Sequence, residues 1–238
     1  MIELRGAAAL LDIEGTLGSI AFVRDVLFPY ADERMDAFVE QHRREPGVRQ
    51  ILERAAGEAG VEADDTPAIL AALHAWSAKN EKITPLKSLQ GLIWKEGYER
   101  HGVSAHVYPD AVAALRRFAG DGIPLYVYSS GSIAAQRLLF GHSAAGDLLP
   151  LMSGLFDTTI GSKLDPASYA RIAGEIATPP GEIVFFSDNS GELDAASAAG
   201  LQTVQLARPE DATVRAERHP AVTTFDDVSL HAGTTVIP

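Results

Sequence analysis

The chain has 238 residues, 46% of them hydrophobic, with a formal net charge of −12 and no cysteine. This length suits one domain with an insertion, the acidic balance without a basic patch argues against a nucleic-acid partner, and the lack of cysteine excludes disulfides and thiolate metal sites. No stretch of about 18 apolar residues occurs and the first residues lack the order of a secretory signal, so we expect a cytoplasmic protein with no membrane partner.

The first predicted element is a buried strand over residues 7–11 that ends at an acidic turn. Its sequence, Ala-Ala-Ala-Leu-Leu, is apolar on both faces, as a central strand of a parallel sheet requires. Asp12 and Glu14 follow it, then a glycine and a threonine. Ligands bind at the carboxyl ends of strands in open α/β sheets, so one acid could serve a metal while the other moves a proton. Solvated acids at a strand-to-loop junction are the alternative interpretation.

Residues 20–105 differ in character from the rest of the chain. They carry charged helical patterns and almost no β-branched runs, with apolar residues at helical spacing over 38–55. Helix starts are indicated at 64–67 and 84–85, where a proline falls in the first turn. We therefore predict a helical cap over 20–105, inserted between the first and second sheet strands of a catalytic core formed by 1–19 and 106–238.

Strands and helices alternate after residue 106. We predict strands over 123–128, 156–160, 182–187 and 201–206, and helices over 133–141, 166–176 and 191–199. This alternation predicts an α/β fold with a Rossmann-like, doubly wound parallel sheet and helices on both faces. Residues 209–238 are expected to add an edge strand around 222–225 and a poorly ordered tail.

The strand over 123–128 and the stretch over 156–160 lead to residues that suit an anion. Ser129 and Ser130 precede a helix, where backbone N–H groups form an anion site. Ser132 is the predicted helix cap, which leaves the Ser129 hydroxyl to donate to a phosphate. Lys163 follows the other stretch; a lone lysine is usually a solvated charge, but beside a carboxylate nucleophile and a phosphate it would neutralise both.

The strand over 182–187 also ends in an acid. Asp188 could complete a Mg²⁺ site with Asp12, because hard oxygen ligands suit that ion. Glu192 and Asp194 are predicted instead to open the next helix, where acids complement the positive end of the helix dipole.

These four segments, in this order, resemble the haloacid dehalogenase superfamily of phosphohydrolases and, within it, the enolase-phosphatase family of methionine salvage. The resemblance covers roughly residues 7–208 and includes Asp-Ile-Glu-Gly-Thr at 12–16 and matching segments at 22–31, 89–98, 126–132, 138–143 and 154–161. Three positions depart from the family pattern: Leu17 replaces a hydroxyl residue, Ser162 an alanine, and Asn189 an aliphatic residue. None of them removes a carboxylate, the phosphate-binding serine or the lysine.

The resemblance implies a bifunctional enzyme that enolises 2,3-diketo-5-methylthiopentyl-1-phosphate and then dephosphorylates the enol, with Mg²⁺, to 1,2-dihydroxy-3-keto-5-methylthiopentene. It assigns Asp12 as the nucleophile that forms an aspartyl-phosphate and Glu14 as the general acid and base. The implied Mg²⁺ ligands are Asp12, the Glu14 backbone carbonyl and Asp188.

The same resemblance assigns the phosphate to Ser129, the Ser130 N–H and Lys163. The phosphorylated diketone is the implied partner, and we expect a monomer. The base for enolisation stays open between Glu14 and a residue of 90–98. Trp94, on a predicted helix of this segment, is either a packing residue or a substrate contact.

Three other functions fit the sequence less well. A generic sugar-phosphate or phosphoglycolate phosphatase would use the same core residues but has no reason to carry the segment 90–98 in this form. A non-catalytic binding protein on this scaffold would be favoured by loss of Asp12 or Asp188, and both are present. A dehalogenase fits less well, because Lys163 and Asp188 suit phosphoryl transfer better.

Overall fold

The structure is a computed structural model that describes residues 1–233. The strands are β1 (Ile2–Gly6), β2 (Ala8–Leu11), β3 (Leu125–Tyr128), β4 (Met152–Phe156), β5 (Ile183–Ser187), β6 (Gln202–Leu206), β7 (Ala221–Val222) and β8 (Val228–Ala232). The helices are α1 (Ile20–Phe22), α2 (Phe28–His42), α3 (Pro46–Ala59), α4 (Thr66–Ala78), α5 (Thr84–Arg100), α6 (Pro109–Gly120), α7 (Ile133–Gly141), α8 (Pro166–Glu175) and α9 (Ser190–Ala198). A π-helical turn, Val23–Leu27, joins α1 to α2.

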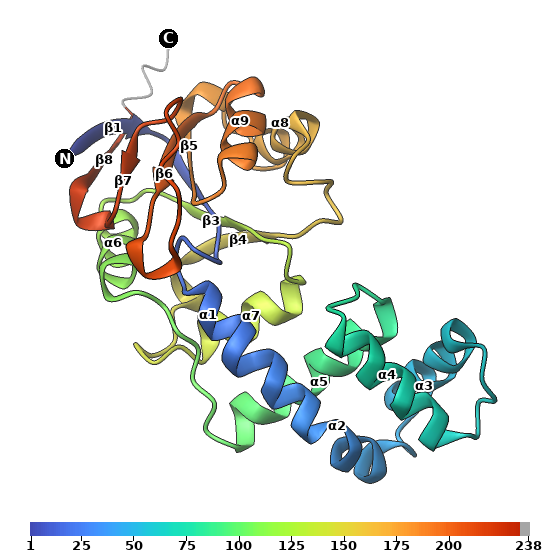
Figure 1. The fold of residues 1–238 in the computed structure, drawn as a ribbon. Helices are drawn as coiled ribbons and strands as arrows, with labels where there is room; N and C mark the ends of the chain where they lie inside the picture. The colour runs from blue at the N-terminus through green and yellow to red at the C-terminus, as the bar shows by residue number, and fades with distance from the viewer. Residues whose placement is uncertain (234–238) are drawn as a thin grey trace. The chain divides into compact units, whose positions relative to one another are not determined.

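The described chain forms two compact units (Figure 1). The core unit consists of Met1–Ile20 and the residues from Ser104 onward, and the helical unit is Ala21–Val103. Within residues 1–233, no helix combines the length and apolar content that a membrane crossing needs.

The core unit contains a six-stranded sheet in the order β4-β3-β2-β5-β6-β7, with every neighbouring pair parallel. All four residues of β2 are buried, as a strand covered on both faces requires. Consecutive residues of β5 point to opposite faces: Phe185 packs on Tyr169 of α8, and Phe186 packs on Phe118 of α6. Helices therefore cover both faces of the sheet, and the predicted doubly wound α/β fold is confirmed.

One predicted strand lies in a different place. The sequence pattern favoured 156–160, but β4 is Met152–Phe156 and the next residues form a turn. The Asp157 carboxylate accepts hydrogen bonds from the N–H and the hydroxyl of Thr159, which offers the backbone a local turn instead of a ladder. Gly161 then has φ of +142°, a conformation that ends any extended run.

The end of the chain is more ordered than predicted. The edge strand β7 covers Ala221–Val222 only, because the Asp110 carboxylate accepts from the N–H of Phe225 and the hydroxyl of Thr224 and so turns the backbone away from the sheet. The strand β8 was not predicted; it pairs in parallel with β1 in a separate two-stranded sheet. Residues 234–238 of the predicted tail lie outside the described part of the chain.

The helical unit is built from α2, α3, α4 and α5 around one apolar core. Met35, Leu52, Ile69 and Leu89, one from each helix, are buried together in this core. Each of these four helices has a proline in its first turn, where the missing N–H costs nothing. Trp94 donates its indole N–H to the Leu27 carbonyl over 2.8 Å, which supports the packing interpretation of this residue.

Candidate active site

Asp12 follows β2 at the carboxyl end of the sheet and is 5% exposed. Its carboxylate accepts from the Ile13 N–H at 2.8 Å and from the Ser187 hydroxyl at 3.3 Å. The loop after it folds tightly, because the Ile13 carbonyl accepts from the N–H groups of three later loop residues, Thr16, Leu17 and Gly18. Asp12 is thus a buried acid held on a compact loop.

Gly15 brings this loop against Asp188, which follows β5. Its φ is +72°, in the left-handed region that favours glycine, and a Cβ built on it would lie 2.5 Å from Asp188 Oδ2. A side chain at position 15 would therefore displace Asp188 as well as strain the turn. Leu17, one of the departures from the family pattern, is fully buried, so its apolar side chain suits the position that it occupies.

Lys163 is buried, contrary to the alternative of a solvated surface charge. It is 6% exposed, and its Nζ lies 2.5 Å from Asp12 Oδ1 and 2.6 Å from Glu192 Oε2. Burial alone would lower the pKa of Lys163, but the neighbouring charges of Asp12 and Glu192 raise it above its usual value. The ammonium group is therefore a fixed positive charge directly beside Asp12.

Glu192 is a site residue that the sequence analysis missed. It does lie in the first turn of α9, as predicted, but its side chain is buried and accepts from the Ser187 hydroxyl at 3.0 Å in addition to its contact with Lys163. Burial and then the charge of Asp12 raise the pKa of Glu192 to about 7. The one sequence signal was its position, four residues after Asp188 and close to the end of the same strand.

Asp188 and the residue after it have separate tasks. Burial, and after it the charge of Asp12, raise the pKa of Asp188 to about 7. The side-chain amide of Gln205 donates a hydrogen bond of 2.9 Å to the backbone carbonyl of Asp188. Asn189, where the family tends to have an aliphatic residue, caps α9 by accepting from the N–H groups of Gly191 and Glu192. This departure from the family pattern therefore stabilises the first turn of α9.

The loop after β3 presents Ser129 and Ser130 at the same edge of the sheet, since β3 lies parallel to β2. The predicted cap is confirmed: the Ser132 hydroxyl accepts from the Ala135 N–H at 3.3 Å and so begins α7. Ser129 is 4% exposed and its hydroxyl accepts from the Gly131 N–H at 3.2 Å. Its hydroxyl hydrogen is thereby left for another acceptor.

Gln136, also missed by the sequence analysis, supports this serine loop from α7. Its amide donates to the carbonyls of Gly131 and Phe156, both at 2.8 Å. The Phe156 carbonyl also accepts from the Ser129 N–H, so one buried side chain joins the loop to the end of β4.

The acids of this site are suited to a hard divalent cation. Asp12 is buried and Asp188 is partly buried, and burial together with the charge of Asp12 raises the pKa of Asp188, which a bound cation would lower again. Among residues 1–233, no group of three histidine, cysteine or acidic side chains is arranged to hold a metal. The predicted set instead has two carboxylates and the Glu14 backbone carbonyl, and oxygen donors of this kind suit Mg²⁺. The Glu14 side chain itself is exposed.

The chain is similar in sequence to known proteins along most of its length. A sequence model of the family described as haloacid dehalogenase-like hydrolase matches residues 7–200. Enolase-phosphatase E1 of Azotobacter vinelandii is 52% identical over 218 residues, which cover 92% of this chain and 95% of that protein. Enolase-phosphatase E1 of Methylococcus capsulatus is 51% identical over 221 residues, which cover 93% and 96%.

A solved structure shows the same likeness. The UTR4 protein of Saccharomyces cerevisiae has 34% sequence identity and a TM-score of 0.81, over 93% of this chain and 99% of that one. This chain is thus similar to all three proteins along nearly its whole length.

Proposed function

The chain belongs to the haloacid dehalogenase-like hydrolases and, within them, to the enolase-phosphatases, and we propose that it is an acireductone synthase of methionine salvage. It enolises 2,3-diketo-5-methylthiopentyl-1-phosphate and hydrolyses the phosphorylated enol to 1,2-dihydroxy-3-keto-5-methylthiopentene and inorganic phosphate. The observation that carries the phosphatase half is Lys163, buried between Asp12 and Glu192 at the carboxyl end of the sheet. The substrate is proposed from the family.

Asp12 is the proposed nucleophile. Its carboxylate oxygen attacks phosphorus, the bond from phosphorus to the substrate oxygen breaks, and Glu14 gives a proton to that oxygen. Water then attacks the aspartyl-phosphate while Glu14 accepts its proton, which releases phosphate and restores both acids. Acid–base help of this kind contributes about 10²–10⁴-fold. The exposed position of the Glu14 side chain allows it to reach a bound substrate.

The phosphoryl group is held by Ser129, the Ser130 N–H and Lys163 in this proposal. The charge of Lys163 offsets the repulsion between the Asp12 carboxylate and the phosphate oxygens, which is largest as the new bond forms. Glu192 fixes Lys163 in place through their ion pair. The Ser187 hydroxyl lies within hydrogen-bond distance of both Asp12 and Glu192 and donates its single hydrogen to one of them at a time. These residues bind and orient; they take no proton from the substrate.

Mg²⁺ is the proposed cofactor. Asp12, the Glu14 backbone carbonyl and Asp188 would hold it, with Gln205 steadying the backbone of Asp188. When bound, the ion supplies positive charge that offsets negative charge on the phosphoryl and enolate oxygens.

We propose Ala21–Val103 as the cap, and Glu14 as the enolisation base. The other candidates were the titratable residues of 90–98, and each has a task in the helical unit. Tyr98 is buried, which raises the pKa of its phenol and disfavours the phenolate. Glu96 contacts His42 and His101, and Lys95 is 57% exposed, 4.0 Å from Glu99. The monomeric state and cytoplasmic location are proposed from sequence alone.

A substrate panel tests the proposal against a generic phosphatase. The unmodified protein is given the diketo phosphate, an aryl phosphate, phosphoglycolate and sugar phosphates, each with Mg²⁺ and with a chelator, and phosphate release is measured. We expect kcat/KM to be highest for the diketo phosphate and turnover to stop with chelator. A higher kcat/KM for phosphoglycolate or a sugar phosphate would contradict the proposal and favour a generic phosphatase. No turnover of any substrate would favour a non-catalytic binding protein.

A further inference from the structure

Two segments of the core unit lead to and from the helical unit. The outgoing segment, 17–20, comes directly after the loop that carries Asp12, and the return segment is 104–108. They are joined by a backbone hydrogen bond of 2.8 Å from the Tyr108 N–H to the Leu17 carbonyl. A contact that fixes the position of one segment therefore also restrains the other segment.

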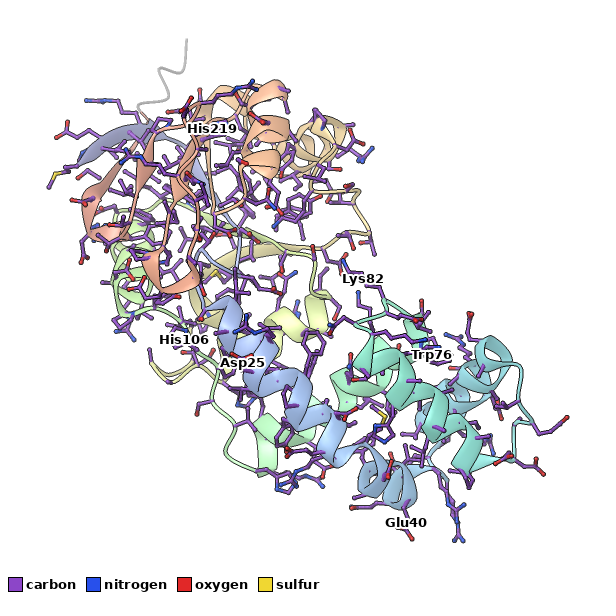
Figure 2. The ribbon with its side chains drawn as sticks, viewed as in Figure 1. Asp25, Glu40, Trp76, Lys82, His106 and His219 are labelled. Carbon is purple, nitrogen blue, oxygen red and sulfur yellow. The ribbon has the colours of Figure 1, made fainter. Side chains whose placement is uncertain are left out.

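The packing of these segments is close. A Cβ built on Gly18 would lie 2.7 Å from the carbonyl oxygen of His106, so only glycine allows this approach. His106, labelled in Figure 2, also accepts from the Ser19 N–H through its Nδ1 at 3.2 Å. The return segment is held in turn by the loop after α7, since the Ala105 N–H donates to the His142 carbonyl.

Asp211 bonds to both segments at once. It ends a short 3₁₀ turn, Pro209–Asp211, after β6. One carboxylate oxygen accepts from the Ser19 hydroxyl and from the Ile20 N–H, both at 3.0 Å, and the other accepts from the Tyr108 hydroxyl at 2.7 Å. Ile20 is the first residue of α1, so Asp211 also satisfies an N–H that the helix itself leaves without a partner.

From these contacts we propose that Asp211 is a positioning residue that anchors both connecting segments, and that reaction of a substrate requiring the helical unit depends on it. This inference rests on the proposed function. Asp211 does not touch the reacting atoms; it acts through Ser19, Ile20 and Tyr108, and its charge influences Asp188 less than burial or the charge of Asp12 does. Hydrogen bonds to an ionised carboxylate are roughly twice as strong as those between neutral groups, so this one side chain suits the task.

Arg208, three residues earlier, provides a contrast. Its Nε donates to the Thr16 carbonyl at 2.9 Å and its NH1 pairs with Asp110 at 3.0 Å, and the side chain is 3% exposed. Arg208 thus supports the Asp12 loop itself, while Asp211 supports the segments beyond it. Substitution of Arg208 is expected to affect every substrate, and substitution of Asp211 mainly a substrate that requires the helical unit.

The test measures kcat/KM for the diketo phosphate and for a small aryl phosphate, with Mg²⁺, in Asp211→Asn and in Asp226→Asn, an exposed acid that serves as the control. We expect Asp211→Asn to lower kcat/KM for the diketo phosphate by about tenfold or more, chiefly through KM, and to change that for the aryl phosphate by less than about threefold. Arg208→Lys should lower kcat/KM for both substrates. Tyr108→Phe, which removes one of the three hydrogen bonds, should give the same pattern on a smaller scale and replaces Asp211→Asn if that variant fails to fold.

Hydrogen exchange separates failure of this inference from failure of the proposed function. In Asp211→Asn the amides of Ile20 and Tyr108 should exchange faster than in Asp226→Asn, whichever substrate the protein uses. Unchanged exchange at both amides, or an equal fall of kcat/KM for both substrates, would overturn the anchoring role. If the unmodified protein leaves the diketo phosphate untouched, the proposed function fails, and the exchange comparison alone then decides whether Asp211 is an anchor.

Discussion

Lys163 Nζ lies 2.5 Å from Asp12 Oδ1, and both side chains are less than a tenth exposed. A carboxylate buried to this extent would usually be paired, and here its partner comes from 151 positions further along the chain. The contact pairs the Asp12 carboxylate with a positive charge, which we propose also contacts the bound phosphate. Glu192 shares the same ammonium group at 2.6 Å, so the lysine is held from two sides.

Glu192→Gln is expected to weaken this arrangement without removing the nucleophile. The amide keeps the shape of the side chain but not its charge, so Lys163 is held by Asp12 alone. We expect aryl phosphate turnover to fall roughly 10-fold and the free energy of unfolding to fall by about 1–3 kcal/mol, as for a weakened hydrogen bond to a buried charge.

The matched control is Asp194→Asn, two residues later on the same helix, where the acid is 51% exposed and contacts His219. Steady-state kinetics and urea unfolding of both variants check the prediction. Equal effects at the two positions would mean that Glu192 is only an acid at the start of α9.

Asp12→Asn should separate the two half-reactions. Without a nucleophilic carboxylate, phosphate release should fall by roughly 10⁴-fold or more, while the enol should still form if Glu14 is the base. We therefore expect the phosphorylated enol to accumulate, as seen by ³¹P resonance. Asp121→Asn, an exposed acid directly after α6, is the control. Full phosphatase activity in Asp12→Asn would remove Asp12 from the mechanism.

The raised pKa of Asp188 predicts a dependence of stability on pH. Its pKa is about 7 in the folded protein and close to 4 when unfolded, so the folded state binds more protons between these values. The free energy of unfolding of the metal-free protein should therefore fall as pH rises from about 4 to 7. Mg²⁺ should raise the unfolding midpoint more at pH 8 than at pH 5.5, because Asp188 is then free of its proton.

Asp188→Asn should reduce the dependence of stability on pH to the part that Glu192 contributes, since the pKa of Glu192 is also raised to about 7. The same variant should weaken the effect of Mg²⁺. Differential scanning calorimetry across pH, with and without Mg²⁺, measures both. A Mg²⁺ stabilisation that is the same in Asp188→Asn would show that Asp188 is not a ligand.

His74 predicts a second dependence on pH, confined to the helical unit. Its two ring nitrogens lie 2.9 Å from Asp32 and 2.8 Å from Asp36, which joins α4 to α2. Burial alone would lower the pKa of His74, but the bonds to Asp36 and Asp32 raise it. This stabilisation is therefore present below the unfolded pKa of about 6.5 and is lost as pH rises through the folded pKa.

Tryptophan fluorescence can follow this unit by itself, because both tryptophans of the chain, Trp76 and Trp94, belong to it. His74→Gln should reduce the loss of stability between pH 6 and 8, relative to the exposed control His231→Gln. An unchanged pH dependence would show that the contact contributes nothing to stability.

The order of elements could be read from the sequence because it depends on local patterns. The apolar run before Asp12 predicted a central strand, and β2 is buried throughout. The small sheet of β1 and β8 could not be predicted in this way. Its strands are more than two hundred residues apart, so their pairing leaves no local pattern, although the alternation of apolar and charged residues over 2–5 suits a half-buried strand.

The grouping of the candidate site residues was predictable where the residues follow strands of the parallel sheet. Asp12, Lys163 and Asp188 lie together as the pattern of strand ends indicated. Glu192 did not stand out, because an acid in the first turn of a helix already has a local explanation. Its actual partner, Lys163, lies 29 positions earlier and is buried with it only in the folded chain. Long-range charge pairing of this kind leaves no local pattern.

The most direct test of the central claim is a magnetic resonance time course of the diketo phosphate with the unmodified protein and Mg²⁺. The proposed function predicts that the phosphorylated enol appears first and is then replaced by inorganic phosphate and the enediol product. Hydrolysis of an aryl phosphate by the same preparation, with the diketo phosphate left unchanged, would contradict it and leave a phosphatase of another substrate.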